Sequence, residues 1–120
     1  MEMDSKKQLM KKANQIRQLA LKAVYSAKSG HPGGSLSIAD IMAYLYFKEM
    51  NIDPKNPKKE DRDRLVLSKG HTCPALYGAL ALKGYFPEEE LCYFRQIDHI
   101  LQGHPDMKGI PGVDMTSGSL

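Results

Sequence analysis

The stretch Asp61-Arg62-Asp63-Arg64-Leu65-Val66-Leu67-Ser68-Lys69-Gly70-His71 decides the fold class. Residues 65–67 are a short apolar run that is abruptly bounded, a pattern typical of a buried parallel strand. The following residues 72–83 predict a helix, which must be buried because residues 75–82 carry no charge. A strand followed by a buried helix indicates an α/β fold. His71 then lies at the carboxyl end of the strand, where ligands bind in open α/β sheets.

Upstream of this stretch the sequence predicts two helices. Residues 5–28 carry one apolar stripe at alternating steps of four and three residues, namely Leu9, Ala13, Ile16, Ala20, Ala23 and Ala27. Ser29-Gly30 ends this helix, and residues 29–36 form a loop. The run Ser37-Ile38-Ala39-Asp40 is similar to a capping box and predicts a second helix to about Glu49. That helix is apolar nearly all round, so we expect it to be buried on more than one side.

Downstream, turns and loops dominate the predicted structure. Residues 51–64 are a polar loop, and Pro87 with three following glutamates starts a helix that ends around Arg95. Residues 98–118 are rich in glycine and proline and predict a loop, and residues 116–120 are similar to the first turn of another helix. One strand cannot form a sheet, because its edge groups need partners. We therefore expect residues 1–120 either to join a large obligate interface or to be the first part of a longer α/β fold, and we favour both. In either case the chain is mostly helical and incomplete at its C-terminal end.

Composition excludes several classes of protein. The net charge of +3 over 120 residues gives no argument for nucleic-acid binding. No apolar run approaches the roughly 18 residues of a membrane span, and the N-terminus lacks the apolar core of a signal peptide. Cys73 and Cys92 match no zinc or redox motif and suit a reducing compartment. The expected location is the cytoplasm.

Three of the four histidines directly follow a glycine, in Gly30-His31, Gly70-His71 and Gly103-His104. Glycine is only 10 of 120 residues, so composition alone does not produce this pattern. Glycine allows close backbone approach to a ligand, and the proline after two of these histidines stiffens the turn. The motifs therefore predict imidazoles that are directed into a cleft as proton donors and acceptors.

Each histidine also has a structural interpretation. His31 either completes a turn or lies in a glycine-rich loop whose N–H groups face an anion. His71 either caps a helix or binds a phosphate. His104 either lies in a surface turn or belongs to the site. No histidine pair has the spacing of a zinc motif, and His99 lies in a polar linker and is treated as unrelated to the site.

Four segments, in the same order and at closely similar spacing, resemble the transketolase family. They are Ser29-Gly30-His31-Pro32-Gly33-Gly34, the stretch from Asp61 to His71, Gln102-Gly103-His104-Pro105-Asp106 and Thr116-Ser117-Gly118-Ser119-Leu120. The resemblance covers nearly the whole chain. It is greatest to the N-terminal subunit of split transketolases, in which two polypeptides share the work of one long chain.

The resemblance implies thiamine diphosphate as cofactor. It also implies the transfer of a two-carbon glycolaldehyde unit from a ketose phosphate to an aldose phosphate, in which the cofactor carries the chemistry and the protein orients the reactants. By the same resemblance, His31 contacts donor and acceptor sugars near the reacting carbons. His71 touches the diphosphate end of the cofactor, and His104 binds the C1 hydroxyl of the donor.

The remaining implied contacts lie at and beyond the end of the sequence. Gly118, Ser119 and Leu120 line the cofactor through their backbone, although many single-chain members have Gly-Pro-Leu there. The family segment that holds Mg²⁺ would follow Leu120, and the catalytic glutamate belongs to another domain. We therefore expect residues 1–120 to need a C-terminal subunit or domain, within a homodimer or heterotetramer, and to be inactive and poorly folded alone. No nucleic-acid or membrane partner is expected.

Two alternatives stay open. The fold could serve another thiamine diphosphate enzyme, one similar to deoxyxylulose-phosphate synthase or one that decarboxylates a 2-oxo acid. The chain could also be a non-catalytic module that kept the motifs. The sequence does not distinguish the pentose phosphate pathway from nucleotide-ribose supply.

Overall fold

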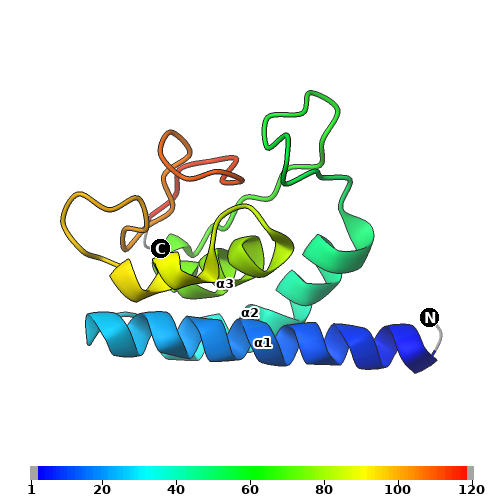
Figure 1. The fold of residues 1–120 in the computed structure, drawn as a ribbon, viewed down its shortest axis with the longest axis horizontal. Coiled ribbons are helices and arrows are strands. Elements are labelled where there is room, and N and C mark those ends of the chain that lie inside the picture. The colour runs from blue at the N-terminus through cyan, green and yellow to red at the C-terminus, as the bar shows by residue number, and fades with distance from the viewer. Residues whose placement is uncertain (1–2, 119–120) are drawn as a thin grey trace.

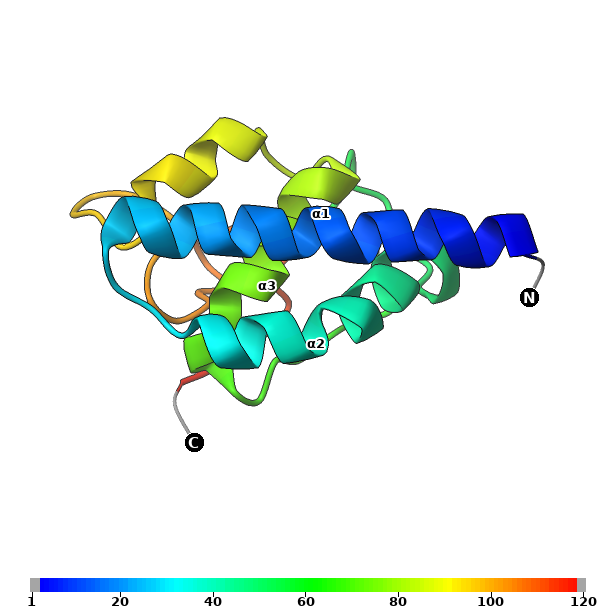
Figure 2. The ribbon, with the colours of Figure 1, turned by 90° about the horizontal axis from the view of Figure 1, so that it is seen from below.

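The computed structural model describes residues 3–118, and the side chains from Ser5 onward, as a layer of helices covered on one side by loops. The long helix α1 (Met3–Ala27) forms one side of the molecule, and α2 (Pro32–Tyr44) and α3 (Cys73–Lys83) pack against it (Figures 1 and 2). Three short helical segments complete the elements: the π-helix η1 (Leu45–Glu49) and the 3₁₀ helices η2 (Gly70–Thr72) and η3 (Glu88–Tyr93). The loops after residue 50 lie on the far side of α3 from α1 (Figure 1).

The predicted helix over residues 5–28 is confirmed as α1. Ala13, Ile16, Ala20 and Ala23 of the predicted stripe are buried, because this face packs on α2 and α3. The chain leaves the helix through Lys28 and Gly30, both with positive φ. Gly30 is required there twice over, since its φ is +138° and an added Cβ would lie 3.0 Å from Cγ2 of Val24.

The prediction that the second helix begins at Ser37 is wrong. It begins at Pro32, because proline at the first helical position loses no hydrogen bond and already has a helical φ. The Ser37 hydroxyl donates to the Gly34 carbonyl, 2.9 Å away, inside the helix rather than capping its start. The helix packs against both α1 and α3, although Ile41 is 57% exposed. The predicted end at about Glu49 is confirmed, with the last turn widened into the π-helix η1.

The third helix is confirmed as α3, and its burial follows the prediction. Every residue from Cys73 to Ala81 is buried, with Pro74 in the first turn. Gly84 ends the helix in the left-handed conformation with φ +111°. Gly78 allows the close approach of α1, because an added Cβ would lie 3.3 Å from the Ile16 carbonyl oxygen.

The predicted strand over residues 65–67 is not formed. Among residues 3–118 no segment pairs with it in a ladder, and a strand needs such a partner for its backbone groups. The Leu65 N–H instead donates to the Asp114 carboxylate at 3.1 Å, and Val66 is 56% exposed. The described part of the chain is therefore helical.

The loops after α3 complete the core. The helix predicted from Pro87 to about Arg95 is a 3₁₀ helix that ends at Tyr93. Residues 98–118 form a loop as predicted, and it buries Leu101, Ile110 and Val113. Residues 116–118 are not helical, and the rest of the helix expected at residues 116–120 lies outside the described residues. Within the described part, no helix is both long and apolar enough to cross a membrane.

Candidate functional site

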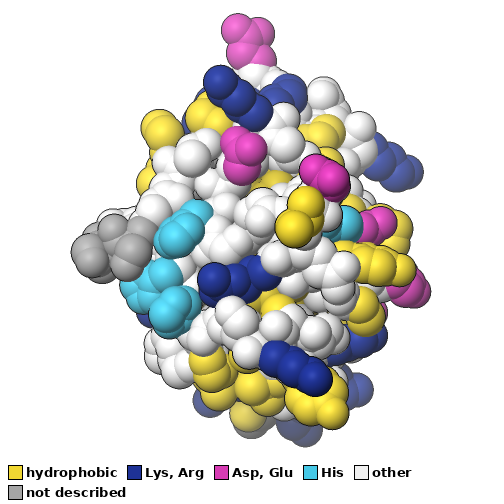
Figure 3. All heavy atoms as spheres, turned by 90° about the vertical axis from the view of Figure 1, so that its left-hand side faces the viewer, with side chains coloured by type: hydrophobic (Ala, Val, Ile, Leu, Met, Phe, Trp, Pro, Cys, Tyr) yellow, Lys and Arg dark blue, Asp and Glu magenta, His cyan; other side chains and the backbone are white. Residues whose placement is uncertain are grey.

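The first two glycine-histidine motifs meet at the start of α2. The rings of His31 and His71 touch edge to face, with centroids 5.0 Å apart and an interplanar angle of 87°. His31 directly precedes α2, and His71 lies in η2, directly before α3. Residues 40 positions apart in the sequence thus form one imidazole pair. Histidine side chains gather along one edge of the molecular face shown in Figure 3, with a basic side chain nearby.

Polar contacts join the first turn of α2 to the turn that carries His71. The Ser35 hydroxyl lies 3.1 Å from the His31 carbonyl oxygen and 3.2 Å from that of Thr72. Lys69 Nζ donates to the Gly34 carbonyl at 3.1 Å. The Thr72 hydroxyl donates to the Lys69 carbonyl at 2.8 Å and closes η2. The relative position of the two histidines is therefore set by backbone carbonyls and buried hydroxyls.

The third motif is anchored to α3 by two buried side chains. The Tyr77 hydroxyl donates to the Gln102 carbonyl at 2.7 Å, and the Cys73 thiol lies 3.2 Å from the Gly103 carbonyl oxygen. Burial raises the pKa of the Cys73 thiol to about 12 and also raises the pKa of Tyr77. Both groups are therefore neutral donors at pH 7 that hold the loop carrying His104. His104 itself is exposed, as is His31.

The last described residues, Ser117 and Gly118, connect the second and third glycine-histidine motifs. The Gly70 N–H donates to the Gly118 carbonyl at 2.9 Å, and the Ser117 N–H donates to the Pro105 carbonyl at 3.3 Å. The segment at Ser117 is thus bonded to the residue before His71 and to the residue after His104. An added Cβ on Gly70 would lie 2.7 Å from Ser117 Oγ, so only glycine permits this approach.

Two buried polar atoms at this junction have no hydrogen-bond partner among the described residues. They are Nδ1 of His71 and Oγ of Ser117. Buried polar atoms are nearly always paired in native proteins. These two belong to segments that the hydrogen bond between Gly70 and Gly118 joins, so together they point to a missing polar partner. The histidine nitrogen can donate or accept a hydrogen bond, and so can the serine hydroxyl.

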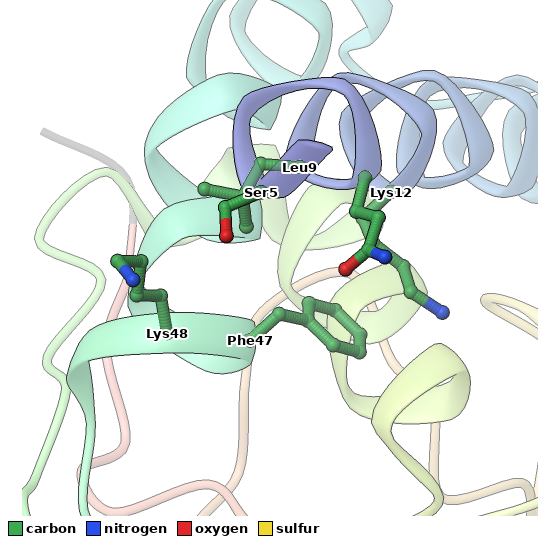
Figure 4. Close-up of a pocket in the computed structure, with 6 residues that line it drawn as sticks. Ser5, Leu9, Lys12, Phe47 and Lys48 are labelled. Carbon is green, nitrogen blue, oxygen red and sulfur yellow. The ribbon is translucent and has the colours of Figure 1, made fainter. Parts of the chain in front are cut away.

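Other hollows and groups lie apart from this junction. A pocket of about 180 Å³ lies between the start of α1 and η1 (Figure 4), lined by Ser5, Gln8, Leu9, Lys12, Phe47 and Lys48. It contains no histidine and none of the glycine-histidine motifs. Within residues 3–118 no group of three or more His, Cys, Asp or Glu side chains could hold a metal ion. His99 pairs with Glu90, with Nε2 and Oε2 2.5 Å apart, and accepts the Leu101 N–H.

Sequence reasoning selected the three histidines but missed the residues that hold them together. Ser35, Lys69, Thr72 and Ser117 were not among the predicted site residues. The only sequence signal for them is their position within the same glycine-containing segments. Of the predicted cofactor-contacting residues, Gly118 lies at the junction through its bond to Gly70. Ser119 and Leu120 lie outside the described residues.

Replacing Gly34 with alanine should destabilise the protein, because the new Cβ would overlap Cγ2 of Thr72, which is buried. Overpacking of this kind typically costs about 1–3 kcal/mol in the free energy of unfolding. Urea denaturation of the complete protein measures it. Gly33→Ala is the matched control, since nothing lies within 4 Å of its added Cβ and alanine favours helix.

Thr72→Ser provides the rescue for this prediction, because it removes Cγ2 and keeps the hydroxyl. The double variant Gly34→Ala/Thr72→Ser should recover most of the lost stability. Equal stability of the two glycine variants, or no recovery in the double variant, would show that the contact between α2 and η2 does not limit packing.

Comparison with known proteins identifies the family of these motifs. Residues 8–120 match the transketolase, thiamine diphosphate binding domain family. The 6-deoxy-6-sulfo-D-fructose transketolase subunit SqwG of Clostridium sp. (strain MSTE9) is 54% identical over 112 residues, which cover 93% of this chain and 41% of that protein. Transketolase 1 of Escherichia coli (strain K12) is 45% identical over 119 residues, 98% of this chain and 18% of that protein.

Solved structures agree with the sequence comparisons. The structure of Pichia stipitis transketolase in complex with sedoheptulose 7-phosphate superposes with a TM-score of 0.88 at 43% identity, covering 93% of this chain and 17% of that one. The chain therefore spans about two fifths of the subunit and less than a fifth of the single-chain relatives. The resemblance inferred from the four segments is confirmed, and with it the α/β thiamine diphosphate-binding fold class. The chain belongs to the transketolase family, as part of its thiamine diphosphate-binding domain.

Proposed function

We propose that this chain is the N-terminal part of the diphosphate-binding domain of a transketolase. With the rest of the protein it transfers a glycolaldehyde unit from a ketose phosphate to an aldose phosphate. The observation that carries the proposal is the contact between His31 and His71 beside the unpaired Nδ1 of His71. A buried imidazole nitrogen without a partner suits a bound polar group, and the family supplies one in thiamine diphosphate.

The residues present fit the diphosphate end of this cofactor. Nδ1 of His71 and the hydroxyl of Ser117 both need a polar partner, and a diphosphate offers several acceptor oxygens. Gly118 lies beside them through its bond to Gly70, and Ser119 and Leu120 continue the same segment. When bound, thiamine diphosphate supplies the carbon nucleophile and electron sink that carbon–carbon cleavage next to a carbonyl requires.

His31 and His104 are the proposed sugar-binding groups. Both are exposed on this chain and so are available to a substrate. A neutral imidazole donates from one nitrogen and accepts at the other, so each can bind a hydroxyl and stabilise charge that develops on a sugar oxygen. His104 is assigned to the C1 hydroxyl of the donor, and His31 to oxygens near the reacting carbons of donor and acceptor. The proline that follows each of these histidines limits the movement of its loop, and the glycine before it allows a close backbone approach.

The proposal extends to a metal and to partners. Mg²⁺ on the diphosphate would take its ligands from residues beyond Leu120. The greater lengths of the relatives support a C-terminal section, on the same chain or a separate one. A dimeric or heterotetrameric assembly in the cytoplasm is part of the proposal. Both sugar phosphates and sulfosugars are candidate donors, because one relative is named for 6-deoxy-6-sulfo-D-fructose and another binds sedoheptulose 7-phosphate.

The test is an assay of the complete protein with its partner section. Thiamine diphosphate and Mg²⁺ are added, and donor consumption is measured with xylulose 5-phosphate, 6-deoxy-6-sulfo-D-fructose or pyruvate. An aldose phosphate is the acceptor. Transfer of two carbons from either sugar supports the proposal, and the ratio of the two kcat/KM values identifies the donor. If pyruvate is the only one of the three donors that is consumed, the protein is a decarboxylating enzyme. If the cofactor binds but no donor is consumed, the chain belongs to a non-catalytic module.

A further inference from the structure

We propose that Ser35 is a positioning residue whose buried hydroxyl sets the spacing between His31 and His71. This inference deepens the proposed function, because the spacing determines where the two imidazoles meet a cofactor and a sugar. Its structural part, the dependence of the histidine pair on one hydroxyl, does not require that function.

The hydroxyl of Ser35 is shared between two carbonyl oxygens. One belongs to His31, at 3.1 Å, and the other to Thr72, at 3.2 Å. A serine hydroxyl has a single hydrogen, so both oxygens attract the same proton. One carbonyl belongs to the first histidine, and the other belongs to the residue that follows the second histidine. The bond therefore acts on the distance between the two rings, which are in edge-to-face contact.

Burial makes this hydroxyl hard to replace. Ser35 is 0% exposed, so water has no open route to substitute for the missing donor. Alanine in this position keeps Cβ but leaves both carbonyl oxygens without the hydroxyl donor. Without the shared hydrogen the oxygens lose their attraction to a common donor, and the cheapest response is for the segments to move apart.

The neighbouring contacts also join the two segments, and they keep α2 in place when the Ser35 hydroxyl is removed. Lys69 Nζ donates to the Gly34 carbonyl at 3.1 Å, one residue before Ser35, in a part-buried hydrogen bond that does not touch the His31 carbonyl. The Ser35 N–H also reaches the His31 carbonyl, at 3.4 Å, but this bond lies within one segment. Ser35→Ala should therefore keep the fold. A change in the contact between His31 and His71 can then be measured without general unfolding.

The experiment compares Ser35→Ala with the unmodified complete protein, first without cofactor or sugar. Histidine Cε1–H signals in two-dimensional NMR report the ring contact, since each ring shifts the signal of the other. The His31 and His71 signals should move while the melting temperature stays within about 3 °C, a shift smaller than a typical core mutation produces. The apparent Kd for thiamine diphosphate, measured by titration calorimetry, should rise about tenfold, comparable to the loss of one buried hydrogen bond.

Two further variants separate positioning from packing. Ser37→Ala is the matched control, because it removes an exposed hydroxyl of the same helix that bonds only to Gly34 and Lys69. It should leave both histidine signals and the cofactor Kd unchanged. Ser35→Cys keeps a donor at the γ position, although a larger and weaker one, and its signals and Kd should lie between those of the alanine variant and the unmodified protein.

The outcomes are distinct. Unchanged histidine signals in Ser35→Ala, with or without a lower melting temperature, would overturn the inference, since the hydroxyl would then be structural only. Moved signals with an unchanged cofactor Kd would overturn the link between spacing and binding. A complete protein that transfers no glycolaldehyde would count against the proposed function alone, because the signals are read without substrate.

Discussion

Replacing His104 with alanine is expected to lower glycolaldehyde transfer by the complete protein by at least ~100-fold, the lower range for a positioned proton donor or acceptor. The loop that carries His104 is bonded to α3 through Tyr77 and Cys73, so the imidazole is held on a rigid support. Removing the ring leaves that support in place. The loss should therefore appear in kcat more than in the melting temperature, and steady-state kinetics with xylulose 5-phosphate measures it.

Lys108→Ala is the control for this prediction. Lys108 is exposed in the same loop, and only its backbone N–H is hydrogen-bonded, to the Asp106 carboxylate at 3.0 Å. This variant should keep kcat within about twofold, since surface substitutions seldom perturb stability or packing. Wild-type turnover in His104→Ala would remove His104 from the reaction and reassign its loop to a surface turn.

Replacing Asp114 with alanine is expected to lower the free energy of unfolding by about 3 kcal/mol, the lower part of the range for breaking a buried ion pair. The Asp114 carboxylate accepts from Arg62 Nε at 2.9 Å and from the Leu65 N–H at 3.1 Å. The side chains are only 13% and 7% exposed, for Arg62 and Asp114 respectively. Without the carboxylate, a mostly buried guanidinium loses its partner, and so does the backbone of the segment that leads to His71.

Urea denaturation of the complete protein measures this loss, and Asp61→Ala is its matched control. The Asp61 carboxylate lies 3.8 Å from Lys59 and is 76% exposed, so its removal should change the free energy of unfolding by at most about 0.5 kcal/mol. If both variants changed the free energy of unfolding equally, Asp114 would not be the residue that bonds residues 62–65 to the last loop.

Local sequence patterns predicted helices α1 and α3, and they also predicted which residues of each helix are buried. The stripe of α1 and the charge-free run of α3 each specify how a helix is buried, and both were confirmed. The start of α2 was misplaced because Ser37 offers a plausible cap, whereas Pro32 and the packing of Gly34 against Thr72 favour an earlier start. The strand at residues 65–67 failed because a strand depends on a partner from elsewhere in a sheet, which residues 3–118 do not supply.

By itself, the sequence determined the family, because four segments in one order and at closely similar spacing form a pattern that needs no coordinates. It also selected the three glycine-histidine motifs as a prediction of the site. Only the tertiary structure decided that His31 and His71 touch, and that the segment at Ser117 joins the turns of His71 and His104. Those contacts depend on a buried hydroxyl shared between distant carbonyls and on glycines that admit a neighbouring backbone. Such contacts join residues far apart in the chain, so no local pattern of residue types encodes them.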